Sequence, residues 1–511
     1  MDTNRRPVAG CHRRGREGPG PRQLPPGDRR MPYRSLRGRV AAASALVIVL
    51  CGCSPRMDSL APASSVTEWD VPVTLTDQAQ QALGATDRPM PAVHRDAPHD
   101  LPALIDLAQR LNPETRVAWE QARVAAHAVD AASAEYFPQI GAGLVMGRGR
   151  SDITYDLPGL GSTTVDNTAT ATVPTVYAEW LLYDSGGRDA AVRLARRLAL
   201  SENIGFNLAH QETVLDVTRE YHELRSARTQ AEAAAEALAN SRRILAAARA
   251  RRDQGLGDVV EVAQAEQALA QAQLDDLRAR GEARSARAAL LASVGVAPDD
   301  DLAIATGPMP LPVEMTQRLD GLVRDALVHR PDILQAVLNL QAQRAAQAGA
   351  EAEFRPKVGV VASLARNEGG LAINGNRFDL PATDSLALLT LEVPIFNGGL
   401  RESRRSAAAA EVAGAEAALA AVRNEAEAAI ITAYEGMRTA VEAVRSAESL
   451  VAASRRTAEA TLSAYREGVG NLPDVLAAQN GLLDAEQLAS QARADAHVSV
   501  AVLAFETGNF Q

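Results

Sequence analysis

The sequence predicts a mainly α-helical chain that also supplies four membrane-type β-strands, and three observations lead to this fold class. One structural unit occurs twice, about 213 residues apart. Alanine-rich stretches with heptad spacing predict long helices, because alanine favours the helix and lets neighbouring backbones approach closely. Four segments alternate apolar and polar residues with a period of two, which is typical of barrel strands in a membrane.

The repeat consists of motifs that recur in the same order. Asn112-Pro113-Glu114 is matched by Arg330-Pro331-Asp332, and the two prolines are 218 residues apart, as are Pro138 and Pro356. Farther along, the separation stays at 213; it pairs Glu179 with Glu392, Tyr183 with Phe396, Arg188 with Arg401, Gly255 with Gly468, and Gly295 with Gly508. This constancy indicates a duplication, with a five-residue length difference in the stretch after Pro138.

Each copy contains two predicted strands, within about 138–183 and about 356–396. Roughly 9–11 residues form one spanning strand, and a barrel has no unpaired edge, whereas four strands alone close nothing. Several chains must therefore contribute, the alternative being a soluble sandwich. The polar, glycine-containing connections 148–171 and 366–384 predict external loops. The apolar face comprises Ile140, Ala142, Leu144, Met146, Val176, Ala178, Trp180 and Leu182, then Val358, Val360, Ala362, Leu364, Leu389, Leu391, Val393 and Ile395; Glu179 and Glu392 fall on the opposite, lumen-facing set.

Long helical hairpins are predicted after the strands, at about 188–295 and about 401–508. Residues 401–465 alone would form a helix of about 100 Å at 1.5 Å per residue. Its heptad seam slips once, as in a coiled-coil stutter, and comprises Val412 and Leu419, then Ile430, Met437, Val444 and Val451. The return helix after Gly468 reaches a similar length if it is joined to the short stretch before Pro331, or its equivalent.

The N-terminal 52 residues predict an export leader. Arg34, Arg37 and Arg39 precede the apolar run 40–51, which is too short for the ~20 residues of a spanning helix but suits a secretory signal. Because Met31 begins a complete leader, we expect translation to start there and residues 1–30 to be untranslated.

The leader ends in Leu50-Cys51-Gly52-Cys53, which resembles a bacterial lipobox. That resemblance implies cleavage before Cys53 and a covalent lipid, including palmitate, on it. Ser54 follows in place of the Asp that marks many inner-membrane lipoproteins, so the outer membrane is favoured. Residues 53–100 would then be a lipid-anchored N-terminal extension. An ordinary signal peptide with an incidental cysteine is the alternative.

Several function classes find little support in the composition. Cys11, Cys51 and Cys53 are the three cysteines, so the mature chain has no disulfide and no cysteine-based metal or redox site. The net charge of −10 gives little electrostatic footprint for nucleic acid. The eight histidines form no HExxH motif, and neither a dinucleotide fingerprint nor a P-loop is present. We therefore expect no enzyme, no metal and no cofactor other than the lipid.

The ordered motifs resemble the TolC-type outer-membrane efflux family, in particular its lipid-anchored OprM/NodT-like branch. The resemblance covers roughly residues 95–508. It rests on the lipobox, His329-Arg330-Pro331-Asp332-Ile333, Phe137-Pro138, Phe354-Arg355-Pro356, Leu182-Tyr183-Asp184-Ser185-Gly186-Gly187-Arg188, Ile395-Phe396-Asn397-Gly398-Gly399, Tyr465-Arg466-Glu467-Gly468 and Leu472-Pro473-Asp474-Val475-Leu476. The tail Gly508-Asn509-Phe510 departs from many relatives, which end in a glycine run and Trp.

This resemblance implies a homotrimeric exit duct: a twelve-stranded barrel in the outer membrane, continued by a tunnel of twelve long helices in the periplasm. The first repeat would occupy 101–300 and the second 319–511, joined by a linker at 301–318. An inner-membrane pump and a periplasmic adaptor (membrane fusion) protein would be the partners, and the lipid anchor favours a pump of the resistance-nodulation-division type. The duct would provide passage without chemistry.

The resemblance also places a gate at the hairpin turns. Asp474 matches a constriction acid, which would form a cation-attracting ring of three carboxylates. Tyr465 matches a residue whose hydroxyl ties tip helices together, and Glu261 matches its possible acceptor. Gly470 stands where the family has a partner Arg, and Ala477 where some relatives have a second Asp. Alternatively, Asp474 faces water and is stabilised by the helix dipole.

Two other functions remain as alternatives. Type I protein secretion uses the same kind of outer-membrane component, so the cargo is unreadable from the sequence. A lipidated periplasmic adaptor would have one hairpin and a lipoyl-like β domain, whereas two hairpins are predicted here.

Overall fold

The computed structural model describes residues 77–82, 97–157, 159, 161–305, 307 and 319–508. The chain divides into two units, 1–93 and 94–511, and the second contains every element discussed below. Within the first unit, residues 77–82 form a short exposed helix. The predicted leader, the start at Met31, the lipidated Cys53, most of the 53–100 extension and most of the 301–318 linker lie outside the described residues.

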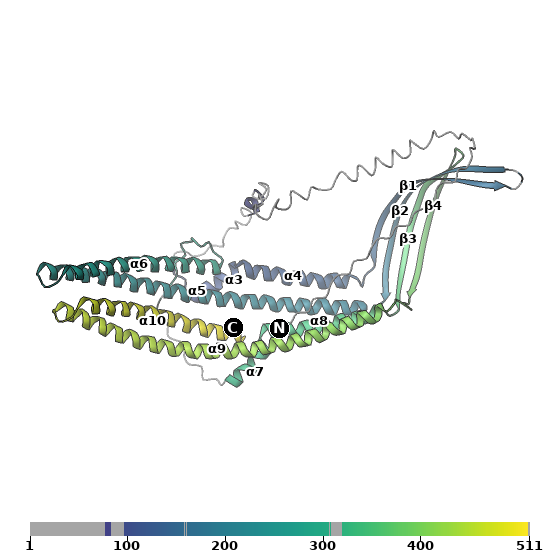
Figure 1. Cartoon of the computed structure of the whole chain (residues 1–511). Helices are drawn as coiled ribbons and strands as arrows, with labels where there is room; N and C mark the ends of the chain where they lie inside the picture. Colours follow the sequence, from purple (N-terminus) through teal and green to yellow (C-terminus); the bar gives the residue numbers. More distant parts are fainter. Residues whose placement is uncertain are drawn as a thin grey trace, which may run out of the picture. The chain divides into compact units, whose positions relative to one another are not determined.

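The second unit consists of two series of helices with matching lengths (Figure 1). Short helices come first in each series, a strand pair follows, and a long hairpin completes it. The first series is α3 (Leu101–Leu111, 11 residues), α4 (Pro113–Ala134, 22), α5 (Gly187–Asp253, 67) and α6 (Val259–Val294, 36). The second is α7 (Leu319–His329, 11), α8 (Pro331–Ala352, 22), α9 (Leu400–Arg466, 67) and α10 (Leu472–Glu506, 35).

The shorter return helices are extended by end-to-end contact with α4 and α8, which begin at Pro113 and Pro331. The predicted partner, the stretch before Pro331, is α7, so that prediction chose the wrong helix. α6 ends at Gly295, in a left-handed conformation, beside the start of α4, where the Asn112 amide donates to the Ser293 carbonyl at 2.9 Å. In the second copy, Arg330 precedes α8 and donates to the Glu506 carbonyl of α10 at 2.8 Å. Its guanidinium also binds the Glu506 and Asp332 carboxylates, at 2.5 and 2.7 Å. Each copy therefore has two helical columns of similar length: the single long helix, and the return helix continued by a short helix.

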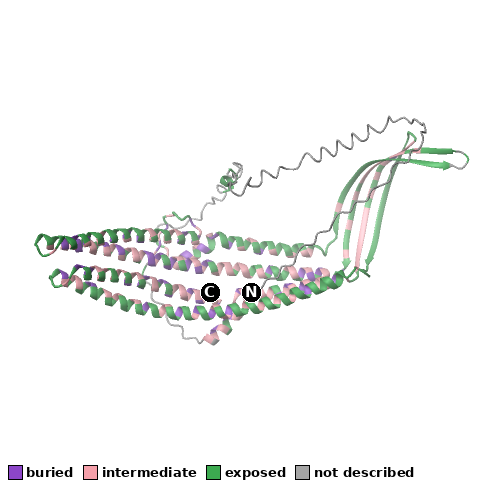
Figure 2. Ribbon diagram, in the orientation of Figure 1, coloured by how far each residue is buried: buried purple, intermediate pink, exposed green. Residues whose placement is uncertain are grey.

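Small and aliphatic side chains form the contact between the helices. Ile430, Met437 and Val444 of the predicted heptad are buried on α9. Alanine lines much of the remaining contact surface of α9 and α10, as at Ala426 and Ala496, which are completely buried. Figure 2 shows buried positions as short patches that alternate with intermediate and exposed positions along the helices. Among the described residues no helix is long and apolar enough to cross a membrane.

The four strands form one antiparallel sheet in the order β1-β2-β3-β4. Their bounds are β1 Gln139–Leu157, β2 Gly161–Tyr183, β3 Lys357–Ile373 and β4 Asn376–Glu392. The register places the predicted apolar residues of the paired segments on one face, with Trp180 opposite Val360 and Val360 opposite Leu389. Leu182 lies at a register shift between β2 and β3, and the predicted Val393 and Ile395 follow the end of β4 at Glu392. That face is uncovered in the single chain, since Ile140 is 74% exposed and Leu389 is 72% exposed.

The predicted external loops 148–171 and 366–384 are wrong: most of each segment continues the strands. β1 pairs with β2 up to Leu157 and Gly161, and β3 pairs with β4 up to the adjacent Ile373 and Asn376. The second hairpin turns through Asn374 and Gly375, both with positive φ (47° and 86°), as a two-residue Asn-Gly hairpin turn requires. Threonines at alternate positions of β2 favour the extended conformation and override the polar, loop-like composition.

Candidate functional site at the hairpin tips

Both hairpins turn with the same backbone geometry. Gly255 (φ 72°) and Gly468 (φ 83°) occupy the left-handed position that follows a helix. In the first turn, the Leu256 amide donates to the Arg251 carbonyl at 2.9 Å; in the second, the Val469 amide donates to the Ala464 carbonyl at 3.0 Å. These bonds satisfy carbonyls that the helix ends leave free, so each long helix ends at a defined place.

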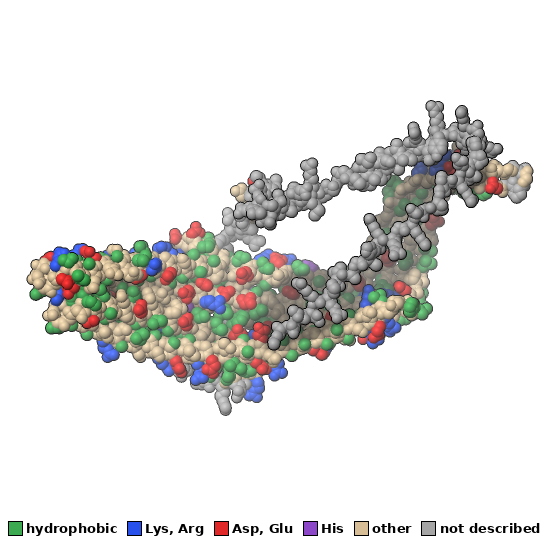
Figure 3. Space-filling model, viewed as in Figure 1, with side chains coloured by type: hydrophobic (Ala, Val, Ile, Leu, Met, Phe, Trp, Pro, Cys, Tyr) green, Lys and Arg blue, Asp and Glu red, His purple; other side chains and the backbone are tan. Residues whose placement is uncertain are grey.

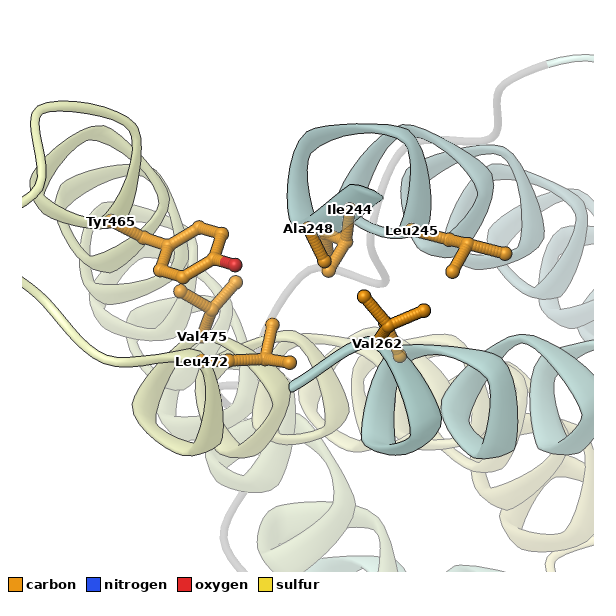
Figure 4. Close-up of a cluster of buried hydrophobic side chains, with 8 residues drawn as sticks. Ile244, Leu245, Ala248, Val262, Tyr465, Leu472 and Val475 are labelled. Carbon is orange, nitrogen blue, oxygen red and sulfur yellow. The ribbon is translucent and has the colours of Figure 1, made fainter. Parts of the chain in front are cut away.

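The four long helices meet beside these turns in one hydrophobic cluster, which we call the tip cluster. Tyr465 at the end of α9 has no exposed surface and is its largest member. Its other members are Ile244, Leu245 and Ala248 of α5, Val262 and Ala265 of α6, and Leu472 and Val475 of α10. Figure 4 shows the Tyr465 ring pointing from its own hairpin toward the α5–α6 hairpin. The tip cluster thus joins the two hairpins of one chain.

A hydrogen bond accompanies this packing. The Tyr465 hydroxyl donates to Glu261 Oε2 at 3.3 Å, from α9 to the first turn of α6. Burial raises the pKa of Tyr465, and the nearby Glu261 charge raises it further, so the phenol keeps its donor proton at neutral pH. The structure therefore brings together Tyr465 and Glu261, two of the residues proposed from the sequence.

Arg251 is a third member of this contact that the sequence did not indicate. Its guanidinium lies 4.8 Å from the centre of the Tyr465 ring, within cation–π range. Nη1 donates to the Tyr465 carbonyl at 3.0 Å and Nη2 to the Leu256 carbonyl at 3.3 Å. Arg251 of the first hairpin thus binds both the side chain and the backbone of Tyr465 in the second. No motif marked it, since the copies differ here: the repeat aligns it with Ala464.

Gly470 stands where an arginine was expected from the resemblance, and the turn explains the difference. A Cβ at Gly470 would lie 2.9 Å from the Tyr465 backbone nitrogen and 3.1 Å from the Ala464 carbonyl carbon. The backbone therefore leaves no room for a side chain at this position. The guanidinium beside the tyrosine comes instead from Arg251, across the hairpin contact.

Asp474 occupies the same place on α10 that Glu261 occupies on α6, 213 residues earlier. Each acid lies three residues after its N-cap residue: the Glu261 amide donates to Asp258 at 2.8 Å, and the Asp474 amide to Asn471 at 2.9 Å. The Asn471 amide also donates to the Asp474 carboxylate at 2.7 Å. Asp474 lines a shallow groove between α9 and α10 with Ala477 and Gly481, and Tyr465 is not part of this groove.

The two strand acids lie on the sheet, away from the tip cluster. Glu179 lies opposite Gln139 and Val361, and Glu392 lies opposite Lys357. The register thereby places both acids on the same face, opposite the apolar one. This second face also carries Leu388, so it is mixed in character.

Comparisons with known proteins agree with this architecture. Residues 104–296 and 322–509, one segment in each copy, match the family model described as outer membrane efflux protein. Over 363 residues the chain is 31% identical to the protein CyaE of Bordetella pertussis, which covers 70% of this chain and 74% of CyaE.

Solved structures share the fold. The outer-membrane channel OprN aligns with a TM-score of 0.64 at 20% identity, covering 83% of this chain and 98% of that one. VceC of Vibrio cholerae aligns with a TM-score of 0.64 at 21% identity, covering 80% and 96%. The CmeC channel of Campylobacter jejuni aligns with a TM-score of 0.67 at 17% identity, covering 80% and 85%. The predicted fold class is confirmed, and the chain belongs to the outer membrane efflux protein family: it is an outer-membrane channel protein and not an enzyme.

Proposed function

We propose that this chain forms the exit duct of a tripartite efflux system, which passes substrate from an inner-membrane pump and a periplasmic adaptor to the exterior. The observation that carries the proposal is the combination of an open, apolar-faced sheet with two helical hairpins of matched length. The sheet suits a membrane, and the 67-residue helices of about 100 Å suit a tunnel across the periplasm.

The functional form we propose is a homotrimer. β1 pairs only with β2 and β4 only with β3 among the described strands, so two edges are free. Unpaired backbone groups are costly in hydrocarbon, because no water is present to bind them. If β4 of each copy pairs with β1 of the next, three copies close a twelve-stranded barrel. Glu179 and Glu392 would then face its lumen and Trp180 the lipid.

Cys53 would carry the lipid that anchors the chain in the outer membrane, with the tunnel projecting into the periplasm. The lipobox-like sequence supports this proposal. Metabolic labelling with palmitate tests it: incorporation should disappear in Cys53→Ser, and a label that persists in this variant would contradict the assignment.

The lipid anchor favours a pump of the resistance-nodulation-division type. Type I protein secretion remains the second candidate, because an exit duct of this architecture serves either cargo. A lipidated adaptor is disfavoured, because the chain has two long hairpins and no lipoyl-like domain among its described residues. Nucleic acid is not an expected partner, since acidic and basic side chains are intermixed over the visible helical face (Figure 3).

At the tip, Tyr465, Glu261 and Asp474 would form the gate, and we add Arg251 to them. Tyr465 and Arg251 hold the two hairpins of one chain together, which keeps the tips close to one another. Asp474 is exposed at the start of α10. In a trimer, three such carboxylates around a narrow axis would attract cations.

Weakening the tip contact should open the channel. Tyr465→Phe removes one hydrogen bond to a carboxylate in each protomer, about 1 kcal/mol, and should raise the open-to-closed ratio in planar bilayers at least about fivefold, and more where the three protomers open together. Arg251→Ala should have a larger effect, since it removes two carbonyl contacts and the cation over the ring.

Arg249→Ala is the matched control, because Arg249 lies two residues away in an exposed pair with Glu266. It should leave conductance unchanged. Equal conductance in wild type, Tyr465→Phe and Arg251→Ala would show that this contact does not restrain the gate.

Removing the Asp474 charge should reduce cation selectivity. Asp474→Asn keeps an oxygen that can accept from Asn471 but removes the carboxylate. Its reversal potential in a salt gradient should shift toward that of a non-selective pore. Asp253→Asn, an exposed acid at the end of α5, serves as the control. Selectivity that is identical in wild type and Asp474→Asn would remove Asp474 from the constriction.

Deletion of the gene separates the two cargo classes. For an efflux duct, the deletion strain should accumulate a dye or drug several-fold above wild type, and the intact gene should restore export. Secreted protein in the medium is measured in the same cultures. Loss of one secreted protein with unchanged drug accumulation would favour type I secretion.

In detergent, the unheated protein should migrate as a trimer, and a monomer would contradict the closed barrel.

A further inference from the structure

A polar cavity lies far from the tip, between the middle of α5 and the neighbouring helices α10 and α9. Its volume is about 320 Å³, enough for several water molecules or a small ion. It is lined by His222, Arg225, Ser226, Arg228, Thr229 and Glu232 of α5, Glu448 of α9, and Ser490, Arg493, Ala494 and His497 of α10. The exit-duct function assigns no role to these side chains.

Two histidines form one wall of the cavity. The rings of His222 and His497 stack with their centres 4.5 Å apart and an angle of 7° between the planes. Although His222 is only 2% exposed, neither imidazole forms a hydrogen bond or ion pair within the described part of the chain. Both imidazoles line the cavity, and a neutral imidazole has one N–H donor and one acceptor nitrogen with which it can bind a ligand there.

Positive charge surrounds the pair. Burial, together with neighbouring His497 and Arg225, lowers the pKa of His222 to about 3; burial and Arg225 also lower the pKa of His497. The half-buried Arg225 stacks against Tyr221 at 6.0 Å and has no carboxylate partner among the described residues. On α10, by contrast, Arg493 is neutralised by Glu448 at 2.9 Å.

The hydroxyl groups of Ser226 and Ser490, which also line the cavity, already have hydrogen-bond partners. Ser490 Oγ donates to the Ser226 carbonyl at 3.2 Å, and Ser226 Oγ accepts from Gln230 at 3.0 Å. The groups left for a ligand are therefore the Arg225 guanidinium and the two imidazoles, which all donate to, or attract, a negative charge. The two carboxylates of the lining, Glu232 and Glu448, are outnumbered by the three guanidinium groups of Arg225, Arg228 and Arg493, and Glu448 is already paired with Arg493.

We propose that this cavity is a binding site for a small oxyanion of the phosphate, sulfate or carboxylate class, held by Arg225 and by the His222–His497 pair. A planar guanidinium pairs with such oxygens through two parallel hydrogen bonds, and imidazole N–H groups complete the shell. The site joins α5 of the first repeat to α10 of the second, so an anion seated there would strengthen the contact between the repeats.

Binding in this site takes up a proton. An anion beside the imidazoles favours their charged form and raises their pKa above the depressed value of the empty site. The bound state therefore holds more protons than the free state between these two pKa values, and affinity increases as the pH falls through that interval. The charges of Arg225, Arg228 and Arg493 oppose protonation of the imidazoles, and those of Glu232 and Glu448 favour it.

Calorimetric titration of the purified full-length protein in detergent with inorganic phosphate tests the proposal. Wild type should bind saturably, and sulfate, which carries two charges throughout this range, should bind more tightly at about pH 5 than at about pH 8. Arg225→Gln should lower the affinity about tenfold or more, since it removes a charge-assisted contact. His497→Gln should weaken the pH dependence. Sulfate and acetate titrations distinguish a tetrahedral dianion from a simple carboxylate.

The matched control is Arg219→Gln, which removes an exposed α5 arginine paired with Asp216 and should bind like wild type. Circular dichroism and unheated gel mobility confirm that each variant is folded and assembled. Absence of saturable binding of all three anions to wild type would overturn the proposal. So would equal affinities in wild type and Arg225→Gln, or equal losses in Arg219→Gln and Arg225→Gln.

Discussion

The hydrogen-bonding demand of the sheet edges is the constraint on which the rest of the molecule depends. The sheet has 17–23 residues per strand and an apolar face, but its outer strands β1 and β4 each have one unpaired side. If those edges pair with the edges of other copies, the assembly has a rotation axis, and the helices that continue the strands are arranged around the same axis. Two hairpins of each chain then reach the same plane, which requires α5 and α9 to have one length, as their 67 residues each provide.

The long helices of the two copies have equal lengths, but side chains at equivalent positions make different contacts. The first strand-to-helix joint is fixed by buried Arg188, which binds the Leu181 and Leu182 carbonyls, whereas Arg401 at the second joint is exposed. At the tip, Glu261 turns toward Tyr465 while Asp474 binds Asn471. Length follows from the geometry of the assembly, but side chains at equivalent places are free to specialise. The tip contact is built from this difference, since Arg251 and Tyr465 have no counterparts in the opposite copy.

The elements could be predicted from periodicity because helix and strand patterns are local. The heptad residues Ile430 and Met437 proved buried, and the alternation from Ile140 proved to be one sheet face. The prediction of loops at 148–171 and 366–384 was wrong because a polar, glycine-containing composition does not exclude a strand. In the second segment Asn374-Gly375 marks a hairpin turn directly. Arg251 could not be predicted, because its contact with Tyr465 spans 214 residues and depends on how two hairpins pack. The same holds for the His222–His497 stack, which joins helices distant in sequence.

Packing between the hairpins therefore has two different kinds of contact along its length. Near the tip it is mostly apolar, with Tyr465 and Leu472 completely buried and a few hydrogen bonds around them. Near the middle it is polar, with Ser226 bound to Ser490 and the stacked imidazoles beside Arg225. An apolar contact is non-directional and tolerates sliding, whereas a polar one is directional and fixes register. The gate proposed above would require the tips to move while the middle stays aligned, and this order of contacts suits it, because the directional contact lies far from the moving end.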